Sequence, residues 1–281
     1  MDVDQCDYNR SYSTGDNLLM NENPITLILV DGMRPDALMH ADTPVIKNLV
    51  NQGAYTLNAR TVFPSVTLPC ITSIFLGVPP ETHGTIGNYW NSTDWQVPGL
   101  IDLLHSAGGK TAAFYNWEQL RDISRPGSLD VSICLNHAES PDLPLGESDV
   151  LVTDSALSFL SSNMFDFIFI YLGCTDTAGH RHGWMSPEYL RAVENADRCI
   201  GRLLQATPRK SHLVIASDHG GHGRTHGSNE DTDITVPLIF HGEMVKAHAL
   251  PHPVSVLDIA PTIATLAGLD IPLEWEGKGL L

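Results

Sequence analysis

The sequence predicts an α/β fold of three layers, in which helices cover both faces of a mostly parallel central sheet. Apolar segments of strand length alternate with amphipathic segments of helix length along most of the chain. Several of the predicted strands are apolar at every position, which is typical of strands buried on both faces of a parallel sheet. The lengths of the connections predict βαβ units and parallel neighbouring strands.

The first half of the chain contains three predicted strands, each separated from the next by one or two helices. Continuous apolar or β-branched runs predict the strands, whereas apolar residues recurring three or four positions apart predict the helices. Glycine ends several of these helices, as Gly53 and Gly77 do. In chain order the predicted elements are strand 25–30, helix 43–52, strand 54–59, helix 69–76, helix 100–107 and strand 111–115.

The second half repeats the alternation after a segment with little periodicity. Residues 116–149 are rich in loop-forming residues, and we expect them to form a small excursion over the sheet edge. The elements predicted after it are helix 154–160, strand 165–172, helix 187–204, strand 212–217, strand 236–240 and helix 258–267.

One domain accounts for the predicted elements. The chain has 281 residues, a length that doubly wound folds often reach around a single sheet. Residues 1–23 are polar and lack periodicity, so we expect them to form an N-terminal arm. The remaining residues, 24–281, are predicted to form a single domain.

Charge and hydrophobicity restrict the possible partners. The formal net charge of −17 argues against binding to nucleic-acid duplexes or anionic membranes, which require basic surfaces. An anionic substrate would need local positive charge, and metal ions could supply it. No run approaches the roughly 20 apolar residues of a membrane span, and no basic start precedes an apolar core. We therefore expect a cytoplasmic protein.

Three of the most apolar strands end in polar residues that can bind metals. Asp31 follows the first strand, Asp176 and His180 follow strand 165–172, and Asp218-His219 follows strand 212–217. Sites in parallel sheets form beyond the carboxyl ends of the strands, so these clusters can converge. A single aspartate after a strand is about as often only a turn or cap residue.

The residue types in these clusters are suitable for metal coordination. The four-residue spacing of Asp176 and His180 places both on one side of a helical turn. His226 adds a third imidazole a few residues after His219. Three carboxylates and three imidazoles suit zinc or manganese, and they are enough for two metal ions.

Seven short motifs between residues 25 and 270 occur in a characteristic order. They are Asp31-Gly32-Met33-Arg34, Thr43-Pro44, Phe63-Pro64-Ser65-Val66-Thr67-Leu68-Pro69, Leu76-Gly77 through Glu81-Thr82-His83-Gly84, Asp176-xxx-His180, Ser217-Asp218-His219-Gly220 and Thr225-His226-Gly227. Their order and spacing resemble the nucleotide pyrophosphatase/phosphodiesterase family of the alkaline phosphatase superfamily.

The resemblance implies an alkaline phosphatase-like domain with two zinc ions. The first zinc would be held by Asp176, His180 and His226. The second would be held by Asp31, Asp218 and His219, with Thr67 as the nucleophile bridging toward it. Asn88 stands where the family carries an asparagine that donates a hydrogen bond to a phosphoryl oxygen, although Gly87-Asn88 is also good turn sequence.

The position of Thr67 also supports a nucleophilic role on physical grounds. A threonine hydroxyl becomes an effective nucleophile when a metal or an adjacent base stabilises its alkoxide. Just before a predicted helix, Thr67 also lies where free backbone N–H groups can meet a phosphoryl oxygen. The alternative is a hydroxyl that only caps the helix.

We therefore expect a metal-dependent phosphoesterase, most similar to phosphodiesterases, that forms a phosphothreonine intermediate on a small phosphorylated substrate. Alternatives are a phosphomonoesterase, a phosphonate hydrolase or a non-catalytic metal-binding relic. Leu68 replaces the aromatic residue that helps the family to sandwich a base, and Tyr89, Trp90 or Trp95 could take its place. Sulfatases of the superfamily use a Cys or Ser nucleophile followed by an arginine, where this chain has Thr67 and Ile71.

Overall fold

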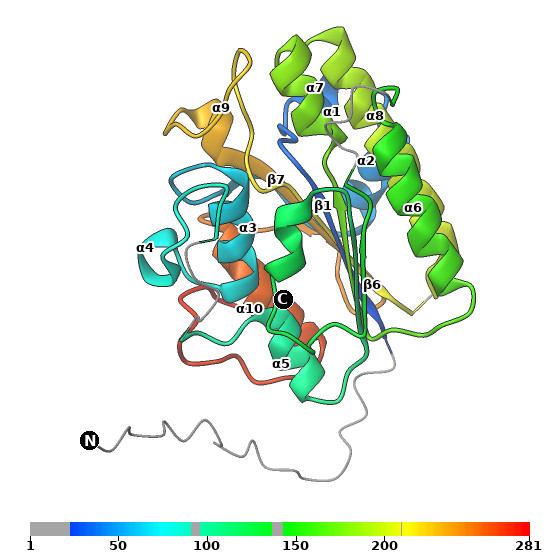
Figure 1. Ribbon diagram of the computed structural model, residues 1–281, viewed down its shortest axis with the longest axis vertical. Helices are drawn as coiled ribbons and strands as arrows, with labels where there is room; N and C mark the ends of the chain where they lie inside the picture. Colours follow the sequence, from blue (N-terminus) through cyan, green and yellow to red (C-terminus); the bar gives the residue numbers. More distant parts are fainter. Residues whose placement is uncertain (1–22, 91–95, 137–142, 209) are drawn as a thin grey trace.

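The computed structural model describes residues 23–90, 96–136, 143–208 and 210–281, and it has the three-layer α/β fold that the sequence predicts (Figure 1). Within these residues eight strands form one sheet in the order β4-β3-β5-β1-β6-β7-β2-β8. The division into an N-terminal arm (1–23) and one domain (24–281) stays a prediction, because residues 1–22 lie outside the described residues.

The centre of the sheet is parallel and buried. Strands β4, β3, β5, β1 and β6 are parallel to one another, whereas β7 runs antiparallel to both β6 and β2. Every residue of β1 and β5 is buried, which explains their continuous apolar sequences. The strands are β1 (Ile25–Val30), β2 (Ala54–Arg60), β3 (Thr111–Tyr115), β4 (Val131–Cys134), β5 (Phe167–Leu172), β6 (His212–Ala216), β7 (Thr235–His241) and β8 (His248–Ala249).

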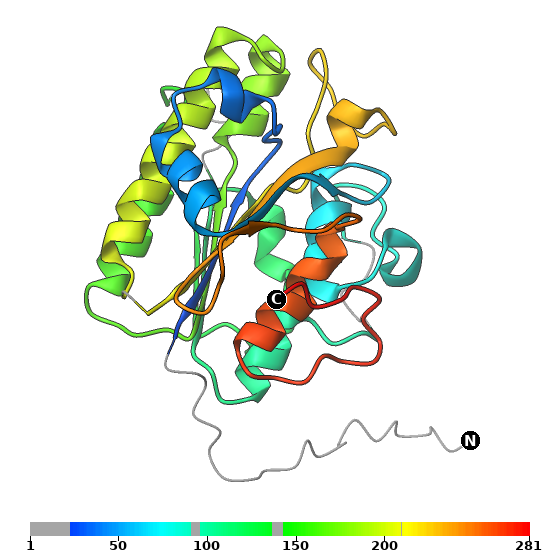
Figure 2. The ribbon, with the colours of Figure 1, turned by 180° about the vertical axis from the view of Figure 1, so that it is seen from behind.

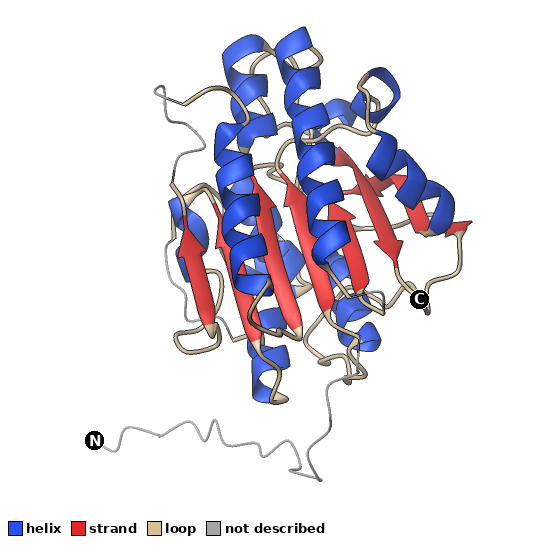
Figure 3. Cartoon of the chain, turned by 90° about the vertical axis from the view of Figure 1, so that its right-hand side faces the viewer, coloured by secondary structure: helices blue, strands red, loops and turns tan. Residues whose placement is uncertain are grey.

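Helices cover both faces of the sheet (Figures 1 and 2). On one face α2 (Pro44–Gln52), α6 (Glu147–Leu160) and α8 (Pro187–Ala206) pack against Ile28 and Val30. On the other face α3 (Thr67–Leu76), α5 (Leu100–Ser106) and α10 (Ile259–Leu266) pack against Leu27 and Leu29. Figure 3 shows the sheet between these two layers. Alternate side chains of β1 therefore belong to two different cores.

The remaining helical elements lie in the connections between the strands. Among the described residues, no helix has both the length and the apolar composition needed to cross a membrane. These elements are α1 (Ala37–His40), α4 (Pro80–His83), η1 (Glu118–Asp122), α7 (Cys174–His182), α9 (Asp231–Ile234) and η2 (Val256–Asp258).

Two boundaries differ from the prediction in ways that matter for the site. Helix α3 begins at Thr67, two residues before the predicted start, so Thr67 is its first residue instead of preceding it. Pro69 is accommodated because the first turn of a helix needs no N–H at that position. The segment 116–149 includes η1, the edge strand β4 and the start of α6, with residues 137–142 outside the description. Strand β4 has only four residues, too few for a periodic pattern.

Candidate functional site

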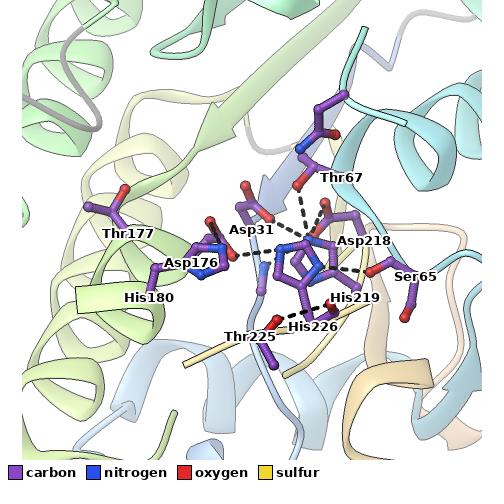
Figure 4. Close-up of polar contacts among 12 residues, drawn as sticks. Asp31, Ser65, Thr67, Asp176, Thr177, His180, Asp218, His219, Thr225 and His226 are labelled. Carbon is purple, nitrogen blue, oxygen red and sulfur yellow. Dashed lines mark hydrogen bonds and ion pairs between the residues drawn. The ribbon is translucent and has the colours of Figure 1, made fainter. Parts of the chain in front are cut away.

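The carboxyl ends of three adjacent strands form the base of the site. Strand β1 lies between β5 and β6 and is parallel to both, so the segments that follow the three strands begin at the same edge of the sheet. Asp31 follows β1 and Asp218-His219 follows β6, while Asp176 lies in the first turn of α7 after β5. The structure therefore brings together residues that are up to 188 positions apart in sequence, from Asp31 to His219 (Figure 4).

A first buried group surrounds the ring of His219. Its Nε2 lies 3.2 Å from Asp31 Oδ1 and 3.4 Å from Asp218 Oδ2. One ligand atom from each of these three residues lies within 4.8 Å of the others. The relative exposures of Asp31, Asp218 and His219 are 3%, 0% and 0%. A positive charge between two carboxylates with so little access to water would stabilise their ionised forms.

A second group surrounds Asp176. His180 Nε2 lies 3.4 Å from Asp176 Oδ2, and His226 Nε2 lies 3.7 Å from Asp176 Oδ1. Ligand atoms of Asp176, His226 and His219 all lie within 4.8 Å of one another, whereas His180, although close to Asp176, is not part of this mutually close set. The rings of His219 and His226 stack with centroids 3.8 Å apart, so His219 lies between the two groups.

The three histidines have the same hydrogen-bond pattern. In each ring Nδ1 faces a backbone carbonyl: that of Arg224 for His180 (3.0 Å), of Gly220 for His219 (2.8 Å) and of Ser65 for His226 (2.9 Å). A carbonyl only accepts, so Nδ1 must donate, and Nε2 is left to bind a metal. This fixed tautomer is typical of metal-ligating histidines.

The carboxylates also fit a divalent cation. Asp31 Oδ1 and Asp218 Oδ2 are buried, and both face the single Nε2 of His219, at 3.2 and 3.4 Å. Buried oxygens of this kind normally have a partner. A cation in contact with oxygen and imidazole ligands would satisfy them, as the hard-to-borderline donor set suggests. The residues present thus fit a metal centre.

Thr67 lies at the edge of the first group. Its Oγ1 is 3.1 Å from His219 Nε2, and the residue is 4% exposed. The N-cap of α3 is Val66, and the helix has no side-chain cap, so the Thr67 hydroxyl does not cap the helix as the alternative interpretation proposed. Asn88 Oδ1 accepts a hydrogen bond from the Leu68 N–H at 2.9 Å, which leaves the Nδ2 group of Asn88 as a donor.

Comparison with known proteins identifies the family. The model of the family described as type I phosphodiesterase / nucleotide pyrophosphatase matches residues 25–231. The chain belongs to this family. Among its relatives, ectonucleotide pyrophosphatase/phosphodiesterase family member 1 of Mus musculus is 30% identical over 220 residues. The match covers 71% of this chain but only 24% of the mouse protein, so the chain spans about a quarter of that relative's length.

Solved structures confirm the three-layer α/β fold that the sequence predicted. A 2-O GAG sulfatase superposes with a TM-score of 0.75 at 18% identity, covering 92% of this chain and 73% of the sulfatase. Murine ectonucleotide pyrophosphatase / phosphodiesterase 5, in an inactive form with AMP, superposes with a TM-score of 0.73 at 14% identity. This match covers 89% of this chain and 96% of the murine chain. At these identities the comparison establishes the fold.

Electrostatics of the nucleotide pyrophosphatase-like site depend strongly on His219. Burial raises the pKa of Asp218 well above its usual value, and the nearby charge of Asp31 raises it further. Burial also acts to raise the pKa of Asp31, but the hydrogen bond and charge of His219 outweigh it and lower that pKa. Burial alone would lower the pKa of His219, yet Asp218 and Asp31 raise it to about 10. In the metal-free protein His219 therefore carries the compensating charge.

His226 has the opposite character. Burial and the charge of His219 lower the pKa of His226 to about 3, so its ring is neutral at physiological pH. A neutral imidazole is the form that binds a metal. The two stacked rings therefore differ in charge when no metal is bound.

One tyrosine hydroxyl and one backbone N–H hold the two central carboxylates in place. The Tyr171 hydroxyl donates a hydrogen bond to Asp31 Oδ2, and the Gly32 N–H donates to Asp218 Oδ1 at 3.1 Å. Gly32 has φ +64°, and a Cβ at this position would lie 3.2 Å from the Asp176 side chain. A side chain at position 32 would be strained and would crowd Asp176, so this position requires glycine.

Two buried residues, which the sequence did not indicate, cap helix α7. Asn116 Oδ1 accepts from the Gly173 N–H at 3.1 Å, and Asp149 Oδ1 accepts from the Cys174 N–H at 3.2 Å. Asn116 also donates to Asp149 at 2.8 Å. Asp149 is fully buried, and burial raises its pKa to about 6. Both residues lie at the ends of the segment interpreted as a loop, and local sequence carries no sign that they meet another helix.

The pocket above the two groups has an aromatic wall that the sequence also did not indicate. Its lining includes Thr67, Asn88, Trp117 and Thr177. The rings of Trp117 and Tyr171 stack with centroids 6.3 Å apart. The full lining is Asp31, Thr67, Asn88, Trp117, Tyr171, Gly173, Asp176, Thr177, His180 and His226.

The aromatic residues suggested from the sequence as replacements for Leu68 do not line this pocket. Trp90 packs against the core and donates its indole N–H to the Gln119 carbonyl at 2.8 Å. Tyr89 is 56% exposed, and Trp95 lies outside the described residues. Trp117 was missed because its partner Tyr171 is 54 positions away in sequence, on strand β5, which pairs with β3 only in the folded protein.

Proposed function

We propose that this chain is a metal-dependent phosphodiesterase in which Thr67 is the nucleophile and two divalent metal ions, zinc or else manganese, complete the site. The observation that carries the proposal is the position of the Thr67 hydroxyl, 3.1 Å from His219 Nε2 and beside a buried cluster of potential metal ligands. Asp31, Asp218 and His219 would hold one ion. Asp176, His180 and His226 would hold the other, with His219 close enough to share it.

The reaction would proceed in two displacements. Bound metal ions would stabilise the Thr67 alkoxide and the negative charge on the phosphoryl oxygens. Thr67 Oγ1, after its proton has passed to solvent, attacks phosphorus and forms a P–O bond, while the group on the opposite side leaves as an alkoxide with the electrons of its own P–O bond and takes a proton from water. Asn88 donates from Nδ2 to a phosphoryl oxygen while its Oδ1 is held by α3. Water then hydrolyses the phosphothreonine, which restores the hydroxyl.

The names of relatives agree with this chemistry. The mouse relative is named a pyrophosphatase/phosphodiesterase, and the inactive murine structure that contains AMP is a threonine-to-alanine variant. A small phosphorylated substrate such as a nucleotide is therefore proposed for this chain. Sulfatase activity is not proposed despite the similar fold, because Thr67 and Ile71 differ from the sulfatase pattern. The cytoplasmic location stays a prediction from the sequence.

Hydrolysis of paired aryl substrates tests the proposal. Protein loaded with two equivalents of zinc is expected to hydrolyse an aryl phosphodiester at least about tenfold faster, in kcat/KM, than the matching monoester. A reversed preference would indicate the alternative phosphomonoesterase, and a preference for aryl phosphonates would indicate a phosphonate hydrolase. Absence of turnover with all three substrates would favour the non-catalytic metal-binding relic.

The aromatic wall predicts the effect of replacing Trp117. Because stacking of a base on an aromatic ring contributes about 1–3 kcal/mol, Trp117→Ala should raise KM for a nucleotide phosphodiester by roughly tenfold. The same change should leave kcat nearly unaltered. Trp117 lines the pocket, and within the described part of the chain it makes no hydrogen bond to a candidate metal ligand. Initial rates over a range of substrate concentrations measure both constants.

Trp117→Phe is the matched control, because it keeps an aromatic face, and KM should stay close to the wild-type value. A KM that is unchanged in Trp117→Ala would show that the leaving group binds elsewhere.

A further inference from the structure

The segment between His219 and His226 folds back on itself. The Gly220 and Gly221 N–H groups donate to the carbonyls of Asp233 and Thr232 at 2.7 and 2.8 Å. Further along, His222 and Thr225 exchange two backbone hydrogen bonds of 2.9 Å each. This turn returns the chain so that the His226 ring stacks on His219. Only six residues therefore separate two candidate ligands, His219 and His226, whose rings are stacked.

One buried carboxylate forms hydrogen bonds to both sides of this turn. Asp233, which is 0% exposed, accepts a hydrogen bond from His222 Nδ1 at 2.8 Å through Oδ1. Its Oδ2 accepts from the Ser228 N–H at 2.9 Å and from the Ser228 hydroxyl at 2.8 Å. His222 and Ser228 lie on either side of His226 in sequence. The Asp233 side chain thus links the segments before and after His226 and fixes the distance between them.

The same contacts reach the nucleophile segment. The carbonyl of Ser228 accepts a hydrogen bond from the Ser65 hydroxyl at 2.8 Å, and the carbonyl of Ser65 accepts from His226 Nδ1 at 2.9 Å. Ser65 is two residues before Thr67 and is fully buried. Asp233, Ser228, Ser65 and His226 therefore form a continuous hydrogen-bonded chain that ends next to the candidate nucleophile.

We propose that Asp233 is a positioning residue that holds His226 at the metal centre and fixes its place relative to Thr67. This inference rests on the proposed function, since it assigns a role within the same site. Charged acceptors in this position bind donors more strongly than neutral ones. Burial acts to raise the pKa of Asp233, but the bonds from His222 and Ser228 outweigh it and lower that pKa, so the group is ionised near neutral pH.

Asp233→Asn tests the proposal with the smallest change in shape. An amide has one acceptor oxygen and a donor NH2, so it cannot accept from His222 and from Ser228 as the carboxylate does. Residues that orient metal ligands typically contribute 10–100-fold to metal affinity. Calorimetric titration with Zn²⁺ should therefore show one binding step weakened by roughly tenfold or more. The step assigned to Asp31, Asp218 and His219 should keep its affinity.

Asp231→Asn is the matched control, because Asp231 lies on the same short helix but is exposed and pairs only with Arg60 among the ion pairs described. Its zinc titration should match that of the wild type. If Asp233→Asn also binds both ions with wild-type affinity, the proposal is overturned while the phosphodiesterase assignment stands. If the wild-type protein binds no metal, the proposed function itself fails.

Ser65→Ala provides a second test should Asp233→Asn fail to fold. It removes only the hydroxyl bond to the Ser228 carbonyl and leaves the backbone contact with His226. The same zinc-binding step should weaken, by less than in Asp233→Asn, with a lower kcat and little change in KM. If both variants fold, their effects should be less than additive, because both interrupt one chain of contacts. Wild-type zinc binding in Ser65→Ala would overturn the proposal.

Discussion

Thr67→Ala is expected to lower kcat for an aryl phosphodiester on the order of 10⁴-fold, as loss of a nucleophile does in other hydrolases. The substitution removes the hydroxyl that lies 3.1 Å from His219 Nε2 and leaves the potential metal ligands in place. Zinc affinity should therefore change little. Initial-rate assays give kcat, and calorimetric zinc titration shows whether the metal centre is preserved.

Two further variants separate the role of the hydroxyl from that of the helix. Thr67→Ser keeps a hydroxyl and should retain most of the activity that Thr67→Ala loses. Thr72 lies on the same helix, is fully buried and donates its hydroxyl to the Leu68 carbonyl at 2.7 Å. Thr72→Ser should therefore leave kcat close to that of the wild type. Full turnover by Thr67→Ala, or no phosphothreonine in the intact mass of quenched wild-type protein, would exclude Thr67 as the nucleophile.

Removal of metal is expected to have an effect of similar size on activity and an additional effect on stability. Without a cation, two buried carboxylates, Asp31 and Asp218, depend on the proton of His219 for compensation. A chelator should abolish turnover, and two equivalents of zinc should restore it. Free zinc at a thousand times Kd should stabilise the fold by about 4 kcal/mol, which thermal unfolding with and without zinc would detect.

The pH dependence of zinc binding follows from the charge of His219. Its pKa of about 10 in the metal-free protein means that its ring is protonated at neutral pH, and a metal must displace that proton. Zinc affinity should therefore rise with pH, by up to about tenfold per unit for each proton released, until the pH approaches 10. Competition titrations between pH 6.5 and 8.5 measure this slope. An affinity independent of pH, or turnover that survives chelation, would contradict the metal-centre assignment.

Much of the fold could be predicted because the relevant information is local. The apolar sequence of β1 indicates a strand that is buried on both faces. Gly53 and Gly77 indicate the ends of two helices, and the structure confirms both ends. The short elements were harder to predict. Strand β4 has four residues that alternate between partial burial and exposure, so its sequence differs little from that of a loop.

The sequence by itself determined the α/β architecture, the strands that precede Asp31, Asp176 and Asp218, and the family, since each depends on residues close together in the chain. Tertiary structure alone decided that His219 lies between the two ligand groups, that Trp117 forms the aromatic wall and that Asp233 fastens the turn at His226. Contacts such as Ser65 with Ser228 span 163 positions. Such pairs leave no periodic trace in sequence, because only the packing of the sheet and its loops brings them within hydrogen-bond distance.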